Sequence, residues 1–291
     1  MYACGPTPRP RVAILGRMAA PASLLDEIAR TFRSPFAPGI VRELAAVDGF
    51  LEHVWPQVAE SVDTAGYLGS ALYMVDMALD AVEAVYEPVL TRESLLEGGL
   101  AEPDLAGVEA TLDLFHWLQP QLLLLLAALA EAQERPRVGG QGRAEPRAPS
   151  PRSEAHLATP IALAAPRTPP LPEVIAALGL SEPPELYRAV ARWPRYLVPA
   201  WDELQHLVAY PDFRRRGRAL YYYARSGSRF LARPLAADAG ALRAAGLDDA
   251  AIARANTIVD AALPALATMM MHCCAMRAGL GIRQREVVTQ A

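Results

Sequence analysis

The sequence contains no lysine and only one asparagine, Asn256, so that all 28 basic residues are arginines. Without lysine, the chain has no Schiff-base nucleophile, no lysine general base and no phosphate-loop lysine. The formal net charge is -4, and no basic stripe interleaved with aromatic residues is present. We therefore expect no nucleic-acid partner.

Cysteine is also scarce, with only Cys4, Cys273 and Cys274 in the chain. Three such residues, two of them adjacent, cannot form a disulfide framework, which favours a reducing, cytoplasmic compartment. The N-terminus lacks the continuous apolar core of a secretory signal. The longest apolar run, Leu122–Ala130, is about half of the roughly 20 residues that a membrane span needs, so no membrane association is expected.

What the chain has in abundance is alanine and leucine, which favour helices because they lose little side-chain entropy there. Hydrophobic residues make up 52% of the sequence, enough for a sizeable core. Apolar spacing predicts an all-α fold, with a kink where Pro120 interrupts a long helix. The helices expected in the first half are Ala22–Phe32, Gly39–Ala46, Phe50–Ser61, Thr64–Tyr86 and Pro103–Gln133.

The second half of the chain resembles the first. Val41–Trp55 matches Tyr187–Trp201 at an offset of 201 − 55 = 146 residues, with Arg, Trp and apolar positions aligned. The mid-helix prolines Pro120 and Pro264 align at 144 residues. We predict two tandem helical repeats packed as an internal pseudo-dimer. The predicted organisation is an N-terminal tail (1–21), repeat 1 (22–133), a Pro/Gly/Arg-rich flexible linker (134–170), repeat 2 (171–282) and a C-terminal tail (283–291).

Two motifs resemble ligand sites but favour plainer interpretations. Gly139–Gly142 has neither the preceding strand nor the lysine of a phosphate cradle, so it is interpreted as linker. His272-Cys273-Cys274 would place neighbouring side chains about 100° apart on a helix, which prevents their convergence on one metal ion. We expect a buried helix face there, and no metal or cofactor.

His116 lies one helical turn before Pro120, and Asp260 lies one turn before Pro264. If the repeats pack about a twofold axis, the two side chains could meet and act as an acid/base pair. Two unrelated, solvated or capped polar groups are the alternative. The arginines at 214–216 and 218 are interpreted as a solvated face, although one of them could attract a carboxylate ligand.

Several segments in order resemble the group I 2-haloacid dehalogenases, a family also called halocarboxylic acid dehydrogenases. The segments are Arg33–Phe36, Arg42–Ala45, Gly49–Trp55, Phe115–Leu124, Arg135–Gly140 and Ala189–Pro194. The resemblance implies an all-helical fold with two repeats, a site between them, and homodimers. It also implies cofactor-free hydrolysis of a carbon–halogen bond, in which an aspartate activates the attacking water.

Carried over position by position, the resemblance makes Phe36 a pocket aromatic and Gln119 the counterpart of a family asparagine. The catalytic aspartate falls on Leu186, which cannot take a proton, and Glu185 is its neighbour. A family tyrosine aligns with Asp260. The scaffold is thus expected to be retained without its usual base.

Three hypotheses follow. The chain is a hydrolase acting on carbon–halide bonds with a relocated base, for which Glu185, or His116 with Asp260, are the candidates. Alternatively, it is a non-catalytic protein that binds a small carboxylic acid or a partner protein through the old cleft. A thiol-dependent peroxidase-like protein using Cys273 or Cys274 is the third.

Overall fold

The structure, a computed structural model, describes residues 22–286 and is mainly helical over that range. The expected N-terminal tail with Cys4, and the last five residues of the expected C-terminal tail, lie outside the described residues. The helices of the first half are α1 (Ala22–Thr31), α2 (Gly39–Ala45), α3 (Phe50–Val62), α4 (Ala65–Glu83), α5 (Arg92–Glu97) and α6 (Glu102–Glu134). The expected all-α fold is confirmed.

The second half follows a connecting segment that holds β1 (Val138–Gly139) and α7 (Pro151–Ala158). Its elements are α8 (Leu171–Leu178), α9 (Glu185–Val190), α10 (Pro194–Val208), α11 (Pro211–Gly227), the 3-10 turn η1 (Ser228–Phe230), β2 (Pro234–Leu235), α12 (Ala239–Ala244) and α13 (Asp249–Gly279). The sequence did not predict the antiparallel pair formed by β1 and β2, because two-residue strands carry no periodic signal.

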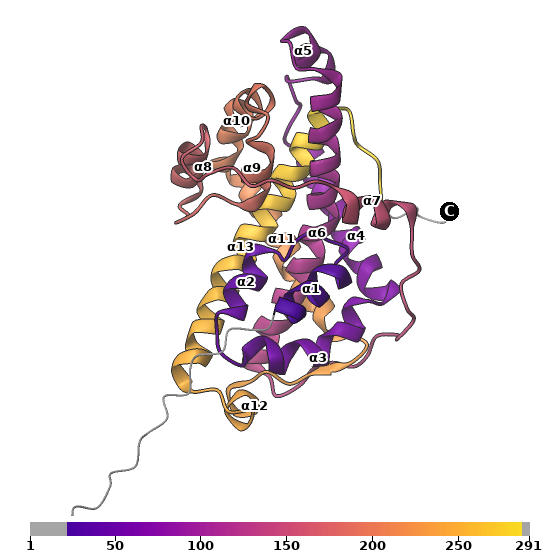
Figure 1. The fold of residues 1–291 in the computed structure, drawn as a ribbon, viewed down its shortest axis with the longest axis vertical. Coiled ribbons are helices and arrows are strands. Elements are labelled where there is room, and N and C mark those ends of the chain that lie inside the picture. Colours follow the sequence, from indigo (N-terminus) through magenta and orange to yellow (C-terminus); the bar gives the residue numbers. More distant parts are fainter. Residues whose placement is uncertain (1–21, 287–291) are drawn as a thin grey trace, which may run out of the picture.

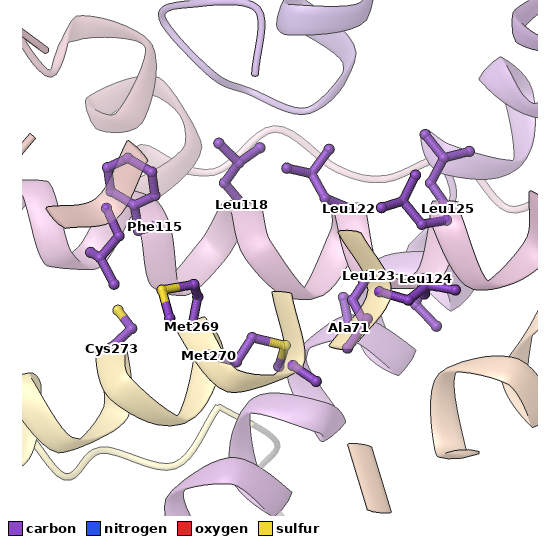
Figure 2. Close-up of a cluster of buried hydrophobic side chains, with 14 of the residues drawn as sticks. Ala71, Phe115, Leu118, Leu122, Leu123, Leu124, Leu125, Met269, Met270 and Cys273 are labelled. Carbon is purple, nitrogen blue, oxygen red and sulfur yellow. The ribbon is translucent and has the colours of Figure 1, made fainter. Parts of the chain in front are cut away.

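Two long helices, α6 and α13, pack along each other at the centre of the molecule (Figure 1), and α4 and α11 complete the core. Local signals start these helices: acidic residues occupy the first turn of α6, and the Asp248 side chain caps α13 by accepting the N–H of Ala251. Both helices continue through an internal proline, Pro120 or Pro264. Buried apolar side chains close the seam, with Met269 and Met270 of α13 beside the leucines of α6 (Figure 2).

The contacts between the halves occur in matched pairs. Helix α4 packs on α13 and α11 packs on α6, while α2 packs on α13 and α9 packs on α6. Exchanging each of these helices for its counterpart in the other half reproduces the same four contacts. This pattern favours the predicted pseudo-dimer, although the superposition of the two halves itself stays a prediction.

The connecting segment is anchored to the two halves at several points, although most of its residues are exposed, as its composition predicted. Two of its residues, Arg147 and His156, are buried. Pro146 forms an isolated antiparallel β-bridge with Thr64, and the N–H of Ala164 donates to the carbonyl of Arg188 at 3.0 Å. The composition did not reveal this anchoring, because individual polar groups provide it and leave no apolar periodicity. The mobility of the segment stays a prediction. Its glycines also allow close packing: a side chain at Gly142 would collide with the carbonyl oxygen of Phe230.

By length and composition, α6 and α13 could each cross a membrane. In this fold, however, 94% of the most apolar window of α6 and 56% of that of α13 are buried inside the protein. The core therefore accounts for the apolar character of α6 and for part of that of α13.

Candidate functional site

The two halves meet where α2 and α9 begin. Pro38 and Pro184 precede these helices with nearly the same backbone conformation, φ −57° and ψ 147° or 145°. The carboxylate of Glu185, the first residue of α9, accepts the backbone N–H of Gly39 at 2.9 Å and the Arg42 guanidinium at 2.8 Å. The first turns of α2 and α9 are therefore joined directly.

This bonding decides what Glu185 can do. Oε2 accepts the N–H of Gly39 and Oε1 accepts Arg42, so that both carboxylate oxygens are engaged and a cation lies beside them. A general base must instead face a water molecule or the substrate proton that it takes. The structure therefore gives Glu185 a bridging role between the halves, which the sequence analysis did not anticipate.

The positions that the family resemblance assigned to a pocket lie around this junction. The Phe36 ring, just before α2, is 6.2 Å from the Phe115 ring of α6, centroid to centroid. Gln119 lies one turn further along α6 and is buried, and its Oε1 atom has no hydrogen-bond partner within residues 22–286. Leu186 on α9, the helix that packs on α6, is only 1% exposed. The junction is thus apolar, with one unsatisfied amide.

His116 lies on α6 in a different environment. Its Nε2 is 3.1 Å from the carboxylate of Glu286, and its Nδ1 is 4.0 Å from the Cys274 sulfur. Burial lowers the pKa of His116 from its ordinary value, and the hydrogen bond to Glu286 opposes that effect only in part. His116 is thus held in the interior by the C-terminal segment.

Glu286 belongs to a partly buried network that the sequence analysis missed. Arg152 of α7 binds both Glu286, at 2.5 Å, and Asp113 of α6, at 2.8 Å. Asp113 also accepts His156 at 2.7 Å and Arg277 at 2.8 Å. Burial alone would raise the pKa of Asp113, but these donors hold it well below its usual range. No local signal could have revealed the network, because its members come from four separate segments.

The predicted pairing of His116 with Asp260 does not occur. His116 is beside Cys274, which is fourteen residues beyond Asp260 on α13, or about 21 Å at the helical rise of 1.5 Å per residue. Asp260 instead lines a separate groove between α8, α11 and α13. The pairing was wrong because it assumed that corresponding helix positions would meet, although α6 and α13 lie side by side and bring other residues together.

His272, Cys273 and Cys274 are all buried, as a core helix face requires. Within the described part of the chain, no three His, Cys, Asp or Glu side chains are grouped to hold a metal. Burial raises the pKa of the Cys273 thiol to about 12 and lowers that of His272 to about 4. A protonated, buried thiol is a poor nucleophile, which disfavours the peroxidase hypothesis.

Comparison with known proteins identifies relatives of this chain. No protein-family model matches it. A configuration-inverting 2-haloacid dehalogenase of Alcaligenes xylosoxydans xylosoxydans is 28% identical over 195 residues, which are 64% of this chain and 65% of that protein. The match thus spans slightly less than two thirds of the length of the curated relative.

Solved structures show the same fold. A D-2-haloacid dehalogenase mutant in complex with D-2-CPA has a TM-score of 0.79 at 19% identity, covering 89% of this chain and 92% of the other. A D-2-haloacid dehalogenase with L-LA also has a TM-score of 0.79 at 19% identity, over 89% and 93% of the two chains. The resemblance that the motifs predicted is confirmed.

Proposed function

We propose that this chain, a helical protein with the fold of the 2-haloacid dehalogenases, binds a small 2-substituted carboxylic acid between its halves and has lost, or altered, the dehalogenase reaction. The proposal is supported by the likeness to proteins of that activity in sequence and fold. The observation that carries it is the pair Glu185 and Leu186. Both carboxylate oxygens of Glu185 accept hydrogen bonds, and Leu186 is a buried hydrocarbon side chain.

The binding part of the proposal is supported by the residues at the junction. Phe36 and Phe115 supply the apolar, aromatic walls that suit the short hydrocarbon part of such an acid. Gln119 supplies a buried amide whose oxygen has no partner in the described chain. A buried polar atom without a partner costs about 1–3 kcal/mol, so a ligand that satisfied this amide would gain that free energy. Turned by 180°, the same amide presents its NH₂ group to a carboxylate oxygen.

The chemical part of the proposal follows from the position of the carboxylates. Hydrolysis by direct water attack needs a base that removes a proton from the water in the transition state. Leu186 offers none, and using Glu185 would require releasing it from Gly39 and Arg42. The loss of a general base lowers a rate by about 10²–10⁴-fold. We therefore expect turnover that is absent or far below that of an ordinary enzyme.

Retained hydrolysis is the second candidate, and the sequence similarity to a configuration-inverting dehalogenase favours it. In that case Glu185 would act as the base after its contacts with the first half open. The two candidates differ in what Glu185→Gln does, because the amide cannot accept a proton from water. If the second candidate is right, Glu185→Gln abolishes activity. If the protein is already inactive, the substitution changes nothing.

Halide release from both enantiomers of 2-chloropropionate tests the proposal, with ligand binding followed in parallel by calorimetry. The natural protein should bind at least one enantiomer and release little or no halide, whereas Leu186→Asp should gain turnover. Leu186→Asn is the matched control, since asparagine is polar and nearly the size of aspartate but cannot act as a base. Ordinary enzyme rates in the natural protein that vanish in Glu185→Gln would establish the second candidate instead.

The likeness to the 2-haloacid dehalogenases leads us to expect a homodimer and a cytoplasmic location. Light scattering coupled to size-exclusion chromatography measures the first directly. A mass near 31.4 kDa, the value for one chain, would contradict the dimer. Cell fractionation with an antibody against the chain tests the second.

A further inference from the structure

A groove of about 910 Å³ lies entirely in the second half, between the C-terminal end of α8, one face of α11 and the middle of α13. Its volume is in the range of small-molecule sites. Its floor is apolar and includes Phe213, Leu263 and Met271. Of the positions to which the family resemblance points, it contains Asp260 but none of Phe36, Gln119 and Leu186. It is therefore separate from the proposed acid site at the junction.

The rim of the groove is cationic. Arg214 and Arg218 both line it, and they are four residues apart on α11, which puts them on the same face of that helix. Within residues 22–286, no ion pair or side-chain hydrogen bond engages either guanidinium. Asp260, on the opposite side, is the acid among the lining residues and forms no ion pair in that range either. Over the described chain, the groove therefore presents two free cations and one free anion around an apolar floor.

The matching place in the first half shows what such a groove can hold. Arg147 of the connecting segment is buried there, between the carbonyl of Thr31, the side chain of Asp63 and the side chain of Gln121. Tyr67 is also near, since the charge of Arg147 opposes the burial effect on its phenol. The occupant of the first-half groove is thus a guanidinium, bound by oxygen atoms.

Residues 146 positions later line the open groove of the second half. Thr31 corresponds to Ala177, Asp63 to Ala209 and Tyr67 to Phe213, and all three counterparts line it. The helices keep the same offset, since α4 begins at residue 65 and α11 at 211, and 211 − 65 = 146. The carboxylate that holds Arg147 is replaced by Ala209, so the second groove lacks an acceptor for a cation at that position.

The second groove instead carries positive charge, whereas the first has the negative charge of Asp63. Arg214 and Arg218 stand where the first half has Leu68 and Leu72 at the same offset. Guanidinium groups bind carboxylates through paired, charge-assisted hydrogen bonds. We propose that the groove between α8, α11 and α13 is a second binding site, which takes a carboxylic acid with an extended apolar body. The carboxylate lies at Arg214 and Arg218, and the body lies on Phe213.

A peptide is the other possible kind of occupant, because a segment of this chain fills the first groove. The sequence segment that precedes the first half, residues 1–21, has Arg9, Arg11 and Arg17 and no acidic residue. Its charge has the same sign as that of Arg214 and Arg218, which disfavours it as the occupant. An acid has the complementary sign.

Calorimetry on the full chain tests the site, with octanoate as the probe and octanol as its neutral counterpart. The double variant Arg214→Gln/Arg218→Gln should weaken octanoate binding about tenfold or more, and leave octanol binding unchanged. Gly217→Leu should abolish binding of both, because a side chain there meets no protein atom within 4 Å and extends into the groove. Arg215→Gln is the matched control, since Arg215 is on the same helix but pairs with Asp212 at 2.5 Å.

The proposal fails if octanoate does not bind at millimolar concentration, or if Arg215→Gln weakens binding as much as the double variant does. It also fails if Gly217→Leu, folded by its circular dichroism, still binds octanoate normally. Deletion of residues 1–21 should leave octanoate affinity unchanged. A large gain in affinity on deletion would identify the N-terminal segment as the occupant and overturn the acid.

Discussion

The carboxylate of Glu185 accepts the backbone N–H of Gly39 across the boundary between the halves, and the two residues are 146 positions apart. This separation equals the offset at which the two halves of the sequence align. Residues that correspond under a twofold exchange can touch only near the rotation axis. The contact therefore marks where a pseudo-twofold axis would pass, between the first turns of α2 and α9.

We predict that the segment 25–67 superposes on 171–213 with the same helix order and direction. The matched contacts of α4 with α13 and of α11 with α6 are the physical reason, since such pairs arise when two copies of one unit pack face to face. An experimental structure of the chain measures this directly. Different helix directions in the two segments would remove the basis for the duplication.

Glu185→Ala should lower the free energy of unfolding by about 1–2 kcal/mol, since one hydrogen bond to a backbone N–H and one partly exposed ion pair are lost. Chemical denaturation monitored by circular dichroism measures the change. Glu182→Ala is the control, because Glu182 is exposed and only three residues away. Equal effects of the two substitutions would contradict a bridging role for Glu185.

Arg147→Met should destabilise the fold by about 2–4 kcal/mol, because it leaves the buried Gln121 side chain without its donor. Trypsin should cut the connecting segment of this variant faster than that of the natural protein. The exposed Arg143, changed to Met, should have neither effect. Rapid tryptic cleavage of the native chain within 143–165 would instead support the flexible linker that the composition predicted.

Stability should fall as the pH is lowered from about 6.5, the ordinary pKa of histidine, towards about 4. Burial lowers the pKa of His272 to about 4 in the folded protein. Between these values the unfolded chain binds a proton that the folded chain does not, so acidification favours unfolding. Thermal melting at a series of pH values should show this decline, and His272→Gln should flatten it. His206→Gln, at an exposed site, should leave the curve unchanged.

A second decline should follow below pH about 4, where carboxylates of the unfolded chain take up protons. Burial would raise the pKa of Glu286, but the hydrogen bonds from His116 and Arg152 and their charges lower it to about 2. Its contribution is therefore complete above the unfolded pKa and is lost as the pH falls through about 2. Glu286→Gln should reduce this acid-side loss in the same melting series. An identical acid profile in the variant would show that Glu286 contributes nothing.

The sequence by itself determined the main helices of the first half, because alanine and leucine spacing, capping acids and the positions of proline act within a few residues of one another. It also supplied the 146-residue offset, and it placed Leu186 where the family resemblance implies an aspartate. It did not reveal the short helices α5 and α7. Only the tertiary structure decided that Glu185 bridges the halves, that Asp260 lies far from His116, and that the connecting segment is anchored through Arg147 and Arg152. The physical reason is that each of these outcomes depends on hydrogen-bond partners far away in the chain, which helical periodicity does not specify.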